Sequence, residues 1–164
     1  MDIRHAEQAD LPTLLDIYNH YIVHTPVTFD IEPRTLAQRR VWLDEFASTG
    51  RHQCFVAVIE DRPVGYACSH RFKEKAAYDP TISTSIYLAP GTHRRGIGRA
   101  LYATLFEALK GEDIHRAYGG ITQPNEASVG LHLAMGFRHI GTETQVGRKF
   151  GKFWDVALYE RQMP

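Results

Sequence analysis

The chain has 164 residues, 43% of them hydrophobic, which is enough for one domain with a buried core. Lysine plus arginine and aspartate plus glutamate both number 19, so the formal net charge is zero and the basic excess of a nucleic-acid-binding protein is absent. The charged first ten residues do not resemble a signal peptide, and no apolar run approaches the roughly 20 residues that span a membrane, so we expect a cytoplasmic protein with no membrane segment.

The first 33 residues predict a strand, a helix and a loop. Residues 2–6 read as a short strand. Asp10 then precedes a run with helical spacing, and we expect it to cap a helix. Residues 24–33 carry prolines at both ends and follow as a loop. The helix should bury one face, made of Leu11, Leu14, Leu15, Tyr18 and Ile22.

Residues 35–70 predict a second helix and a hairpin. The T-x-x-Q pattern over 35–38 is a capping box, so a helix should begin near Leu36 and stop before Gly50. Residues 53–60 and 63–70 are rich in strand-forming side chains and flank a short turn, which predicts a hairpin.

The second half alternates strands with helices. Its segments are a strand over 81–89, a glycine loop over 91–98, a helix over 97–110, a strand over 116–122, a helix over 125–135 ended by Gly136, and strands over 137–143 and 153–161. The complete order is β-α-α-β-β-β-α-β-α-β-β. Its middle part indicates a partly parallel sheet with helices on its faces.

The glycine loop, GTHRRGIG, predicts a site for a phosphate or pyrophosphate. The first N–H groups of a helix lack internal partners and carry the positive end of its dipole. Gly96 and Gly98 have no side chain to block a ligand, so the loop would form an anion cradle, and a solvated basic turn is the alternative. A Rossmann site is disfavoured because position 101 is Leu and the acidic ribose-binding residue is missing, and a P-loop would need G-K-[ST].

Cysteines and histidines give little support to a metal site, and we expect none. Cys54 and Cys68 fall on successive predicted strands, where they could approach each other as reduced core thiols. His20 and His24 lie four apart on a predicted helix, but the glutamate of HExxH and a third ligand are both missing.

The loop over 93–98 fits the Q/R-x-x-G-x-G/A pattern of the GNAT acetyltransferases, with His in the first place. Nearly the whole chain resembles one branch, the phosphinothricin acetyltransferase-like proteins, through motifs over 18–22, 25–33, 78–88, 124–137 and 147–156. The resemblance implies a single domain over 1–164 with an α/β (α+β) GNAT fold, a mixed, mostly antiparallel seven-stranded sheet with helices on both faces. It also implies acetyl-CoA as co-substrate and a homodimer.

The same resemblance implies where acetyl-CoA would bind. Main-chain groups of the strand before the glycine loop would pair with the pantetheine arm, and the loop amides would hold the pyrophosphate. Asn125 would contact the pantetheine or acetyl end. The implied residues are Ile86, Tyr87, Leu88, His93, Arg94, Arg95, Gly96, Ile97, Gly98, Arg99 and Asn125.

Acetyl transfer to an amine needs an unprotonated amine, donors for the oxyanion and a proton for the leaving thiolate. The resemblance implies a strand that splays after Ser83, which makes the N–H of Leu88 our candidate oxyanion donor. The family carries a glutamate, proposed as general base, where this chain has Ser83, which can at most hold a water in a proton relay. His132 suits either proton role, or is a satisfied buried histidine. Tyr78 is a weaker candidate for proton handling or substrate contact.

Family position implies that Phe29, Phe72, Lys73 and Tyr78 approach the acceptor, and Arg71 belongs to the basic run over 70–75. This charge favours an acidic, amino-acid-like acceptor such as phosphinothricin, methionine sulfoximine or methionine sulfone. Two alternatives stay open. One is a different amine, such as a polyamine, an aminoglycoside or a protein N-terminus, and the other is a catalytically weak acyl-CoA-binding module, which the serine at position 83 suggests.

Overall fold

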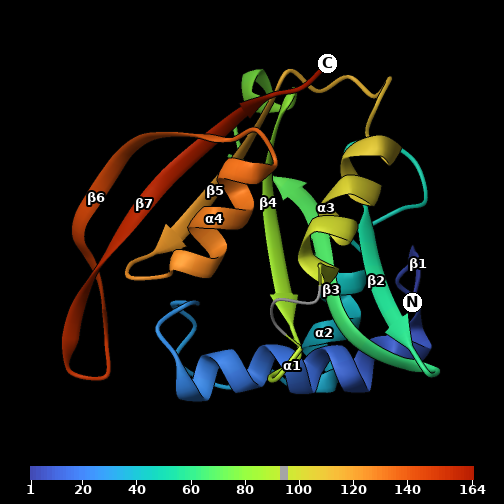
Figure 1. Ribbon diagram of the computed structural model, residues 1–164, viewed down its shortest axis with the longest axis horizontal. Coiled ribbons are helices and arrows are strands. Elements are labelled where there is room, and N and C mark those ends of the chain that lie inside the picture. Colours follow the sequence, from blue (N-terminus) through green and yellow to red (C-terminus); the bar gives the residue numbers. More distant parts are fainter. Residues whose placement is uncertain (93–95) are drawn as a thin grey trace.

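The computed structural model describes residues 1–92 and 96–164 (Figure 1). The order of helices and strands is the predicted one. The strands are β1 (Asp2–His5), β2 (Cys54–Ile59), β3 (Arg62–Arg71), β4 (Thr81–Leu88), β5 (Arg116–Thr122), β6 (Arg138–Lys149) and β7 (Lys152–Gln162). The helices are α1 (Leu11–His24), α2 (Leu36–Leu43), α3 (Ile97–Ala108) and α4 (Glu126–Ala134), with short 3-10 turns at Gln8–Asp10 and Ala76–Tyr78.

The strands form one sheet in the order β1-β2-β3-β4-β5-β7-β6. β4 and β5 pair in parallel, and the other neighbours pair antiparallel. This is the mixed, mostly antiparallel sheet that the resemblance implied. β4 and β5 are paired only from Thr81 to Ser83, whereas β5 runs on beside β7 to Thr122. The two central strands therefore diverge after Ser83, as expected.

Helices cover both faces of the sheet (Figure 1). Alternation along each strand sends neighbouring side chains to opposite faces. On β2, Phe55 and Ala57 join the core under α3, which includes Leu101 and Leu105. Cys54 and Val56 join a second core with α1, and Cys54 lies directly opposite Cys68 as a buried free thiol, as predicted.

The first helix buries a slightly different face from the predicted one. Leu11, Leu14 and Ile22 are buried as expected, but Leu15 is only half-buried and Ile17 takes a place in the core. The apolar stripe on this helix is wide, and its packing against the sheet decides which edge of the stripe is covered.

Two boundaries predicted from the sequence were wrong. α2 ends at Leu43, not just before Gly50, because the next segment bonds as turns: Phe46 N–H donates to Leu43 O, and Ala47 N–H donates to His52 O. β6 runs to Lys149 instead of stopping at residue 143. Its polar second half lacks a strand pattern of its own and is held by pairing with β7 around register shifts near 143–147.

Candidate active site

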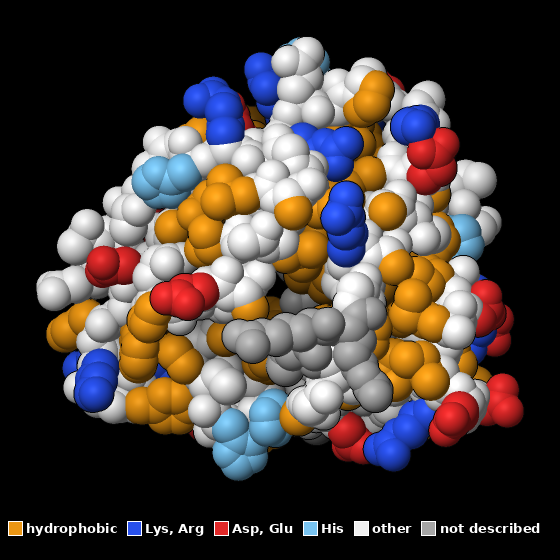
Figure 2. Space-filling model, in the orientation of Figure 1, with side chains coloured by type: hydrophobic (Ala, Val, Ile, Leu, Met, Phe, Trp, Pro, Cys, Tyr) orange, Lys and Arg blue, Asp and Glu red, His pale blue; other side chains and the backbone are white. Residues whose placement is uncertain are grey.

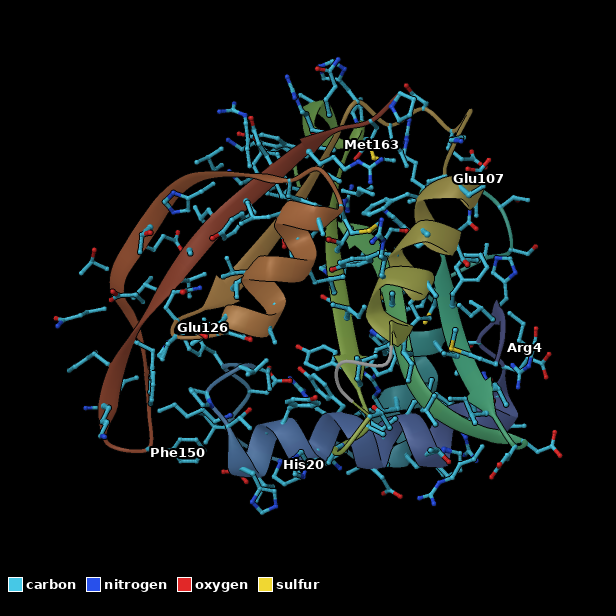
Figure 3. The ribbon with its side chains drawn as sticks, viewed as in Figure 1. Arg4, His20, Glu107, Glu126, Phe150 and Met163 are labelled. Atoms are coloured by element: carbon cyan, nitrogen blue, oxygen red, sulfur yellow. The ribbon has the colours of Figure 1, made fainter. Side chains whose placement is uncertain are left out.

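A cleft opens where β4 leaves β5, and α4 borders it; Figure 2 shows a hollow beside α4 on this face. We call it the β4–β5 cleft. Glu126 marks the first turn of α4 (Figure 3). The lining of the cleft comes from β4, β5, α3, α4 and the loop after α1, and includes Val27, Thr84, Ser85, Ile86, Tyr87, Leu88, Tyr102, Gly120, Ile121, Thr122, Asn125, Ser128, Leu131 and His132.

The main chain of β4 presents polar groups to this cleft. Ala89 N–H donates to Val64 O on β3 at 2.8 Å. Because neighbouring residues of an antiparallel strand alternate in the direction of their N–H and C=O groups, those of Ile86 and Leu88 face away from β3. Those of Tyr87 face β3, so Tyr87 contributes to the cleft through its other atoms. The carbonyl of Leu88 accepts a 2.7 Å hydrogen bond from the Tyr21 hydroxyl.

The two glycines at the start of α3 have different structural roles. Gly96 caps the helix with φ of 75°, a left-handed conformation that glycine adopts without strain. Gly98 is buried, and a Cβ there would lie 3.1 Å from Cδ2 of Leu131 on α4. The absence of a side chain at Gly98 therefore allows α3 and α4 to pack closely. From the sequence we had explained this absence by ligand access alone. Ile97 is buried and Arg99 is exposed, and the predicted residues His93, Arg94 and Arg95 lie outside the described residues.

At the start of α4, Asn125 is both a helix cap and a cleft residue. Its side-chain oxygen accepts a hydrogen bond from Ser128 N–H at 3.1 Å. This satisfies one of the free N–H groups of the first turn. The amide nitrogen of the same side chain remains a donor that can serve a ligand in the cleft.

His132 lies deep in the cleft and is 3% exposed. Its Nδ1 is 2.8 Å from the carbonyl of Ser128, which can only accept, so Nδ1 carries the proton. Its Nε2 then accepts from the Tyr102 hydroxyl at 3.2 Å. Burial lowers the pKa of His132, so the imidazole is neutral at pH 7. A Cβ at Gly119 would lie 2.9 Å from Nε2, so that glycine makes room for the ring.

A second cavity of about 440 Å³ lies on the other face of β4, under α2. We call it the α2–β3 cavity. Ser85 and Tyr87 line both spaces, so a single strand separates them. Its lining is Tyr18, Asp30, Arg34, Gln38, Arg39, Trp42, Glu45, Tyr66, Cys68, His70, Arg71, Ser85 and Tyr87.

Arg39 is the most unusual group in this cavity, since it is charged and only 5% exposed. Its guanidinium lies 3.4 Å from the centroid of the Trp42 ring and donates to the Tyr66 hydroxyl at 2.9 Å. Its Nε is buried and has no hydrogen-bond partner among the described residues. Arg39 also forms no ion pair within residues 1–92 and 96–164.

Comparison with known proteins identifies the family and the fold. Residues 14–137 match the model of the acetyltransferase (GNAT) family. The chain belongs to this family. A phosphinothricin N-acetyltransferase of Streptomyces coelicolor is 50% identical over 99% of the chain and 96% of that relative.

Two solved structures agree with this GNAT assignment. A ribosomal-protein-alanine N-acetyltransferase from Brucella melitensis has a TM-score of 0.92 with 34% identity, over 99% of both chains. An acetyltransferase from Salmonella typhimurium, solved with acetyl-CoA, has a TM-score of 0.93 with 27% identity, over the whole of this chain and 94% of its own. The protein is thus an acetyl-CoA-dependent N-acetyltransferase.

In this GNAT enzyme the predicted acceptor residues separate into three places. Arg71 lines the α2–β3 cavity. Phe72 stacks on Tyr118 at 4.6 Å, and Lys73 lies near the rings of Phe72 and Tyr78, so these form one surface cluster beyond both spaces. Phe29 packs instead against Gly147 of β6, where a Cβ would collide with its ring. Ser83 is half-buried, and because it is two residues from Ser85 on β4, both side chains lie on the same face of the sheet.

Sequence reasoning missed four residues of this arrangement. Tyr21 and Tyr102 sit on helices, where each reads as an ordinary packing residue. Arg39 reads as surface charge, and His70 was predicted only as part of the basic run over 70–75, with no role of its own. Only the pairing of distant strands and helices brings them to β4, so no local pattern distinguishes them.

The described residues hold no group of three His, Cys, Asp or Glu side chains arranged to bind a metal ion. His20 and His24 do lie side by side on α1, with ring centroids 4.9 Å apart. No described helix is both long enough and apolar enough to cross a membrane.

Proposed function

We propose that this acetyltransferase acetylates the primary amine of a small, acidic, amino-acid-like acceptor by direct attack on the thioester of acetyl-CoA. Phosphinothricin, methionine sulfoximine and methionine sulfone represent this class. We further propose that it works as a cytoplasmic homodimer in which residues 1–164 form one domain. The buried guanidinium of Arg39, which forms no ion pair among the described residues, is the observation that carries the choice of acceptor.

The β4–β5 cleft fits the pantetheine arm of acetyl-CoA. Ile86 and Leu88 face it with main-chain donors and acceptors, and Asn125 offers an amide. The left-handed Gly96 caps α3, whose second residue, Gly98, adjoins the cleft residues Ile86 and Leu88, and free N–H groups at a helix start favour an anion such as the pyrophosphate. Bound acetyl-CoA would supply the thioester carbonyl, and the N–H of Leu88 would donate to its oxygen as negative charge develops there.

The leaving thiolate needs a proton, and we place its source on the wall of the cleft opposite β4. We assign protonation of the departing sulfur to the Tyr102 hydroxyl, held in place by Nε2 of His132. Both groups are buried, and burial raises the pKa of Tyr102 while it lowers that of His132. The pair is therefore uncharged at pH 7 and holds one transferable proton beside the strand.

The α2–β3 cavity fits an acidic acceptor. A buried guanidinium without a carboxylate partner is costly, and contact with Trp42 offsets only part of that cost. A ligand carboxylate or phosphinate would provide the missing charge, and Arg71, which is paired with Asp79 at 3.4 Å, lines the same cavity. Asp30 does not fill this role, because it is held by Arg34 and the Tyr18 hydroxyl. Phe72, Lys73 and Tyr78 would contact the outer end of the acceptor.

The test is steady-state kinetics of Arg39→Gln with Arg40→Gln, an exposed neighbour on the same helix, as control. Loss of a charge-assisted hydrogen bond is expected to raise the KM for an acidic acceptor about 10- to 100-fold, with the KM for acetyl-CoA unchanged. Arg39→Lys keeps the charge and checks that any loss does not come from unfolding. Equal acceptor KM values in wild type and Arg39→Gln would remove the basis for an acidic acceptor.

A protein N-terminus is the second candidate acceptor, favoured by the similarity to the Brucella structure. Thiol release from acetyl-CoA is measured against phosphinothricin, methionine sulfone, spermidine and an alanine-terminated peptide. The proposal expects the highest kcat/KM for one of the two acids. A preference for spermidine or the peptide contradicts it.

A further inference from the structure

We infer that Ser85 and His70 form the relay that removes the proton from the acceptor's ammonium group. This inference rests on the proposed function and assigns the base that a neutral amine requires. Ser85 lines both the cleft and the α2–β3 cavity, and His70 lines the cavity. The pair is therefore placed where an amine would enter to meet the thioester.

The hydrogen-bond geometry gives the relay a direction. Nε2 of His70 is 3.0 Å from Oγ of Ser85, and Nδ1 has a longer contact of 3.4 Å with the carbonyl of Arg71. A carbonyl can only accept, so Nδ1 carries the proton and Nε2 accepts from the Ser85 hydroxyl. Ser85 can then receive a proton on its oxygen while it passes its own to His70.

The charge balance of the reaction needs such a group. The ammonium form of the acceptor gives one proton through Ser85 to His70, which leaves a neutral amine and an imidazolium. The amine nitrogen then bonds to the acetyl carbon, the C–S bond breaks and the Tyr102 hydroxyl protonates the sulfur, and the second proton of the nitrogen then replaces the proton that Tyr102 gave up. His70 returns its proton to water, so the net products are the amide, coenzyme A thiol and one proton.

The surroundings of His70 keep it ready to accept. Burial is the main cause that lowers its pKa, and neighbouring His52 acts in the same direction. The hydrogen bond to the carbonyl of Arg71 and the carboxylate of Glu45 oppose them. The groups facing it come from its own strand, from β4, from α2 and from the loop after α2: Cys68, Arg71, Ser83, Ser85, Arg39, Glu45 and His52. Arg71 is itself paired with Asp79 at 3.4 Å, so burial is what chiefly favours the neutral imidazole at pH 7.

His132 cannot take this role from its position. It lies on the face of α3 and α4, and its Nε2 is engaged by Tyr102. His70 and Ser83 are register partners on β3 and β4, with His70 on the α2 face of the sheet. Among the described residues that line the two spaces, His70 thus lies on the side of the entering amine, and His132 lies on the side of the leaving sulfur, where it holds Tyr102.

The experiment compares pH profiles of kcat/KM for wild type, His70→Asn, Ser85→Ala and the control His115→Asn, whose side chain is exposed on the far end of the sheet. An alkyl amine with a pKa near 9–10 is only about 0.1–1% neutral at pH 7. We expect His70→Asn and Ser85→Ala to lose roughly 100-fold at pH 7, with the deficit closing to within about threefold near pH 9.5. The double variant should lose no more than either single one.

A second substitution that restores activity distinguishes a proton relay from a purely structural role of His70. The substitution Ser83→Glu would put a carboxylate directly opposite residue 70, so His70→Asn/Ser83→Glu should regain at least tenfold at pH 7 over His70→Asn. A deficit equal at every pH, or no deficit, overturns the relay while the proposed function stands. Wild type that acetylates neither phosphinothricin nor methionine sulfone overturns the proposed function itself.

Discussion

Asp10, Lys149 and Arg39 are three of the buried charged side chains, and their charges are compensated to different degrees. Asp10 receives two hydrogen bonds from Arg4, at 2.8 and 2.9 Å, and one from Glu7 N–H. Lys149 donates to the carbonyl of Thr28 at 2.8 Å. Arg39 has aromatic rings and one hydroxyl but no carboxylate among the residues described. The least compensated of the three is the one that lines a cavity, which is what a ligand-binding charge requires.

Asp10 gives a stability prediction with a definite pH dependence. Burial acts to raise its pKa, but the hydrogen bonds from Arg4 and Glu7 prevail and lower it. A carboxyl with a lowered pKa stabilises the fold above its unfolded pKa, near 4, and loses that effect as the pH falls through its folded value. Asp10→Asn should cost about 2 kcal/mol in urea unfolding at pH 7. The exposed Asp16→Asn serves as control.

The difference in unfolding free energy between wild type and Asp10→Asn should stay constant from pH 8 to pH 5 and shrink below about pH 4. A difference that grows in acid would mean that the pKa of Asp10 is raised in the folded protein, which contradicts the prediction.

At the scale of one element, β4 carries the site because its two edges have different partners. One edge pairs with β3 along its whole length, from Ile82 to Leu88. The other edge loses β5 after Ser83, since β5 stays with β7. Strand alternation then aims the polar main chain of Ile86 and Leu88 into the cleft and the side chains of Ser85 and Tyr87 toward the cavity.

The N–H of Leu88 can be tested by replacing that peptide bond with an ester, which removes the donor and leaves the side chain. Loss of one oxyanion donor is expected to lower kcat about 100- to 1,000-fold. Because this N–H faces away from β3, the melting temperature should change little. The comparison is protein made in the same way with leucine, and equal kcat values would exclude Leu88 as the donor.

At the scale of the whole molecule, the β6–β7 hairpin projects from the sheet with its apolar side chains uncovered. Val146, Phe150 and Phe153 are 53%, 55% and 61% exposed. Phe150 lies at the turn of the hairpin (Figure 3), and hydrophobic side chains gather over that end in Figure 2. Uncovered aromatic side chains grouped on one projecting element are typical of a protein interface, which supports the proposed homodimer.

We expect wild type to sediment as a dimer of the 18.7 kDa chain and Phe150→Ser/Phe153→Ser to dissociate at concentrations at least tenfold higher. Sedimentation velocity over a concentration series measures this, with the exposed Glu143→Ser as control. A wild-type monomer at high micromolar concentration would refute the homodimer.

The sequence by itself determined the order of strands and helices, the glycine turn into α3 and the family, because capping, periodicity and turn chemistry act over a few residues. It did not determine where α2 ends or how far β6 extends, since contacts with distant segments set both. Only the tertiary structure decided the partners of the site. Tyr102 meets His132 across 30 positions because α3 and α4 share a face, and His70 meets Ser85 because β3 and β4 pair in one register. Likewise, the side chain of Arg39 becomes buried only when α2 packs on the sheet.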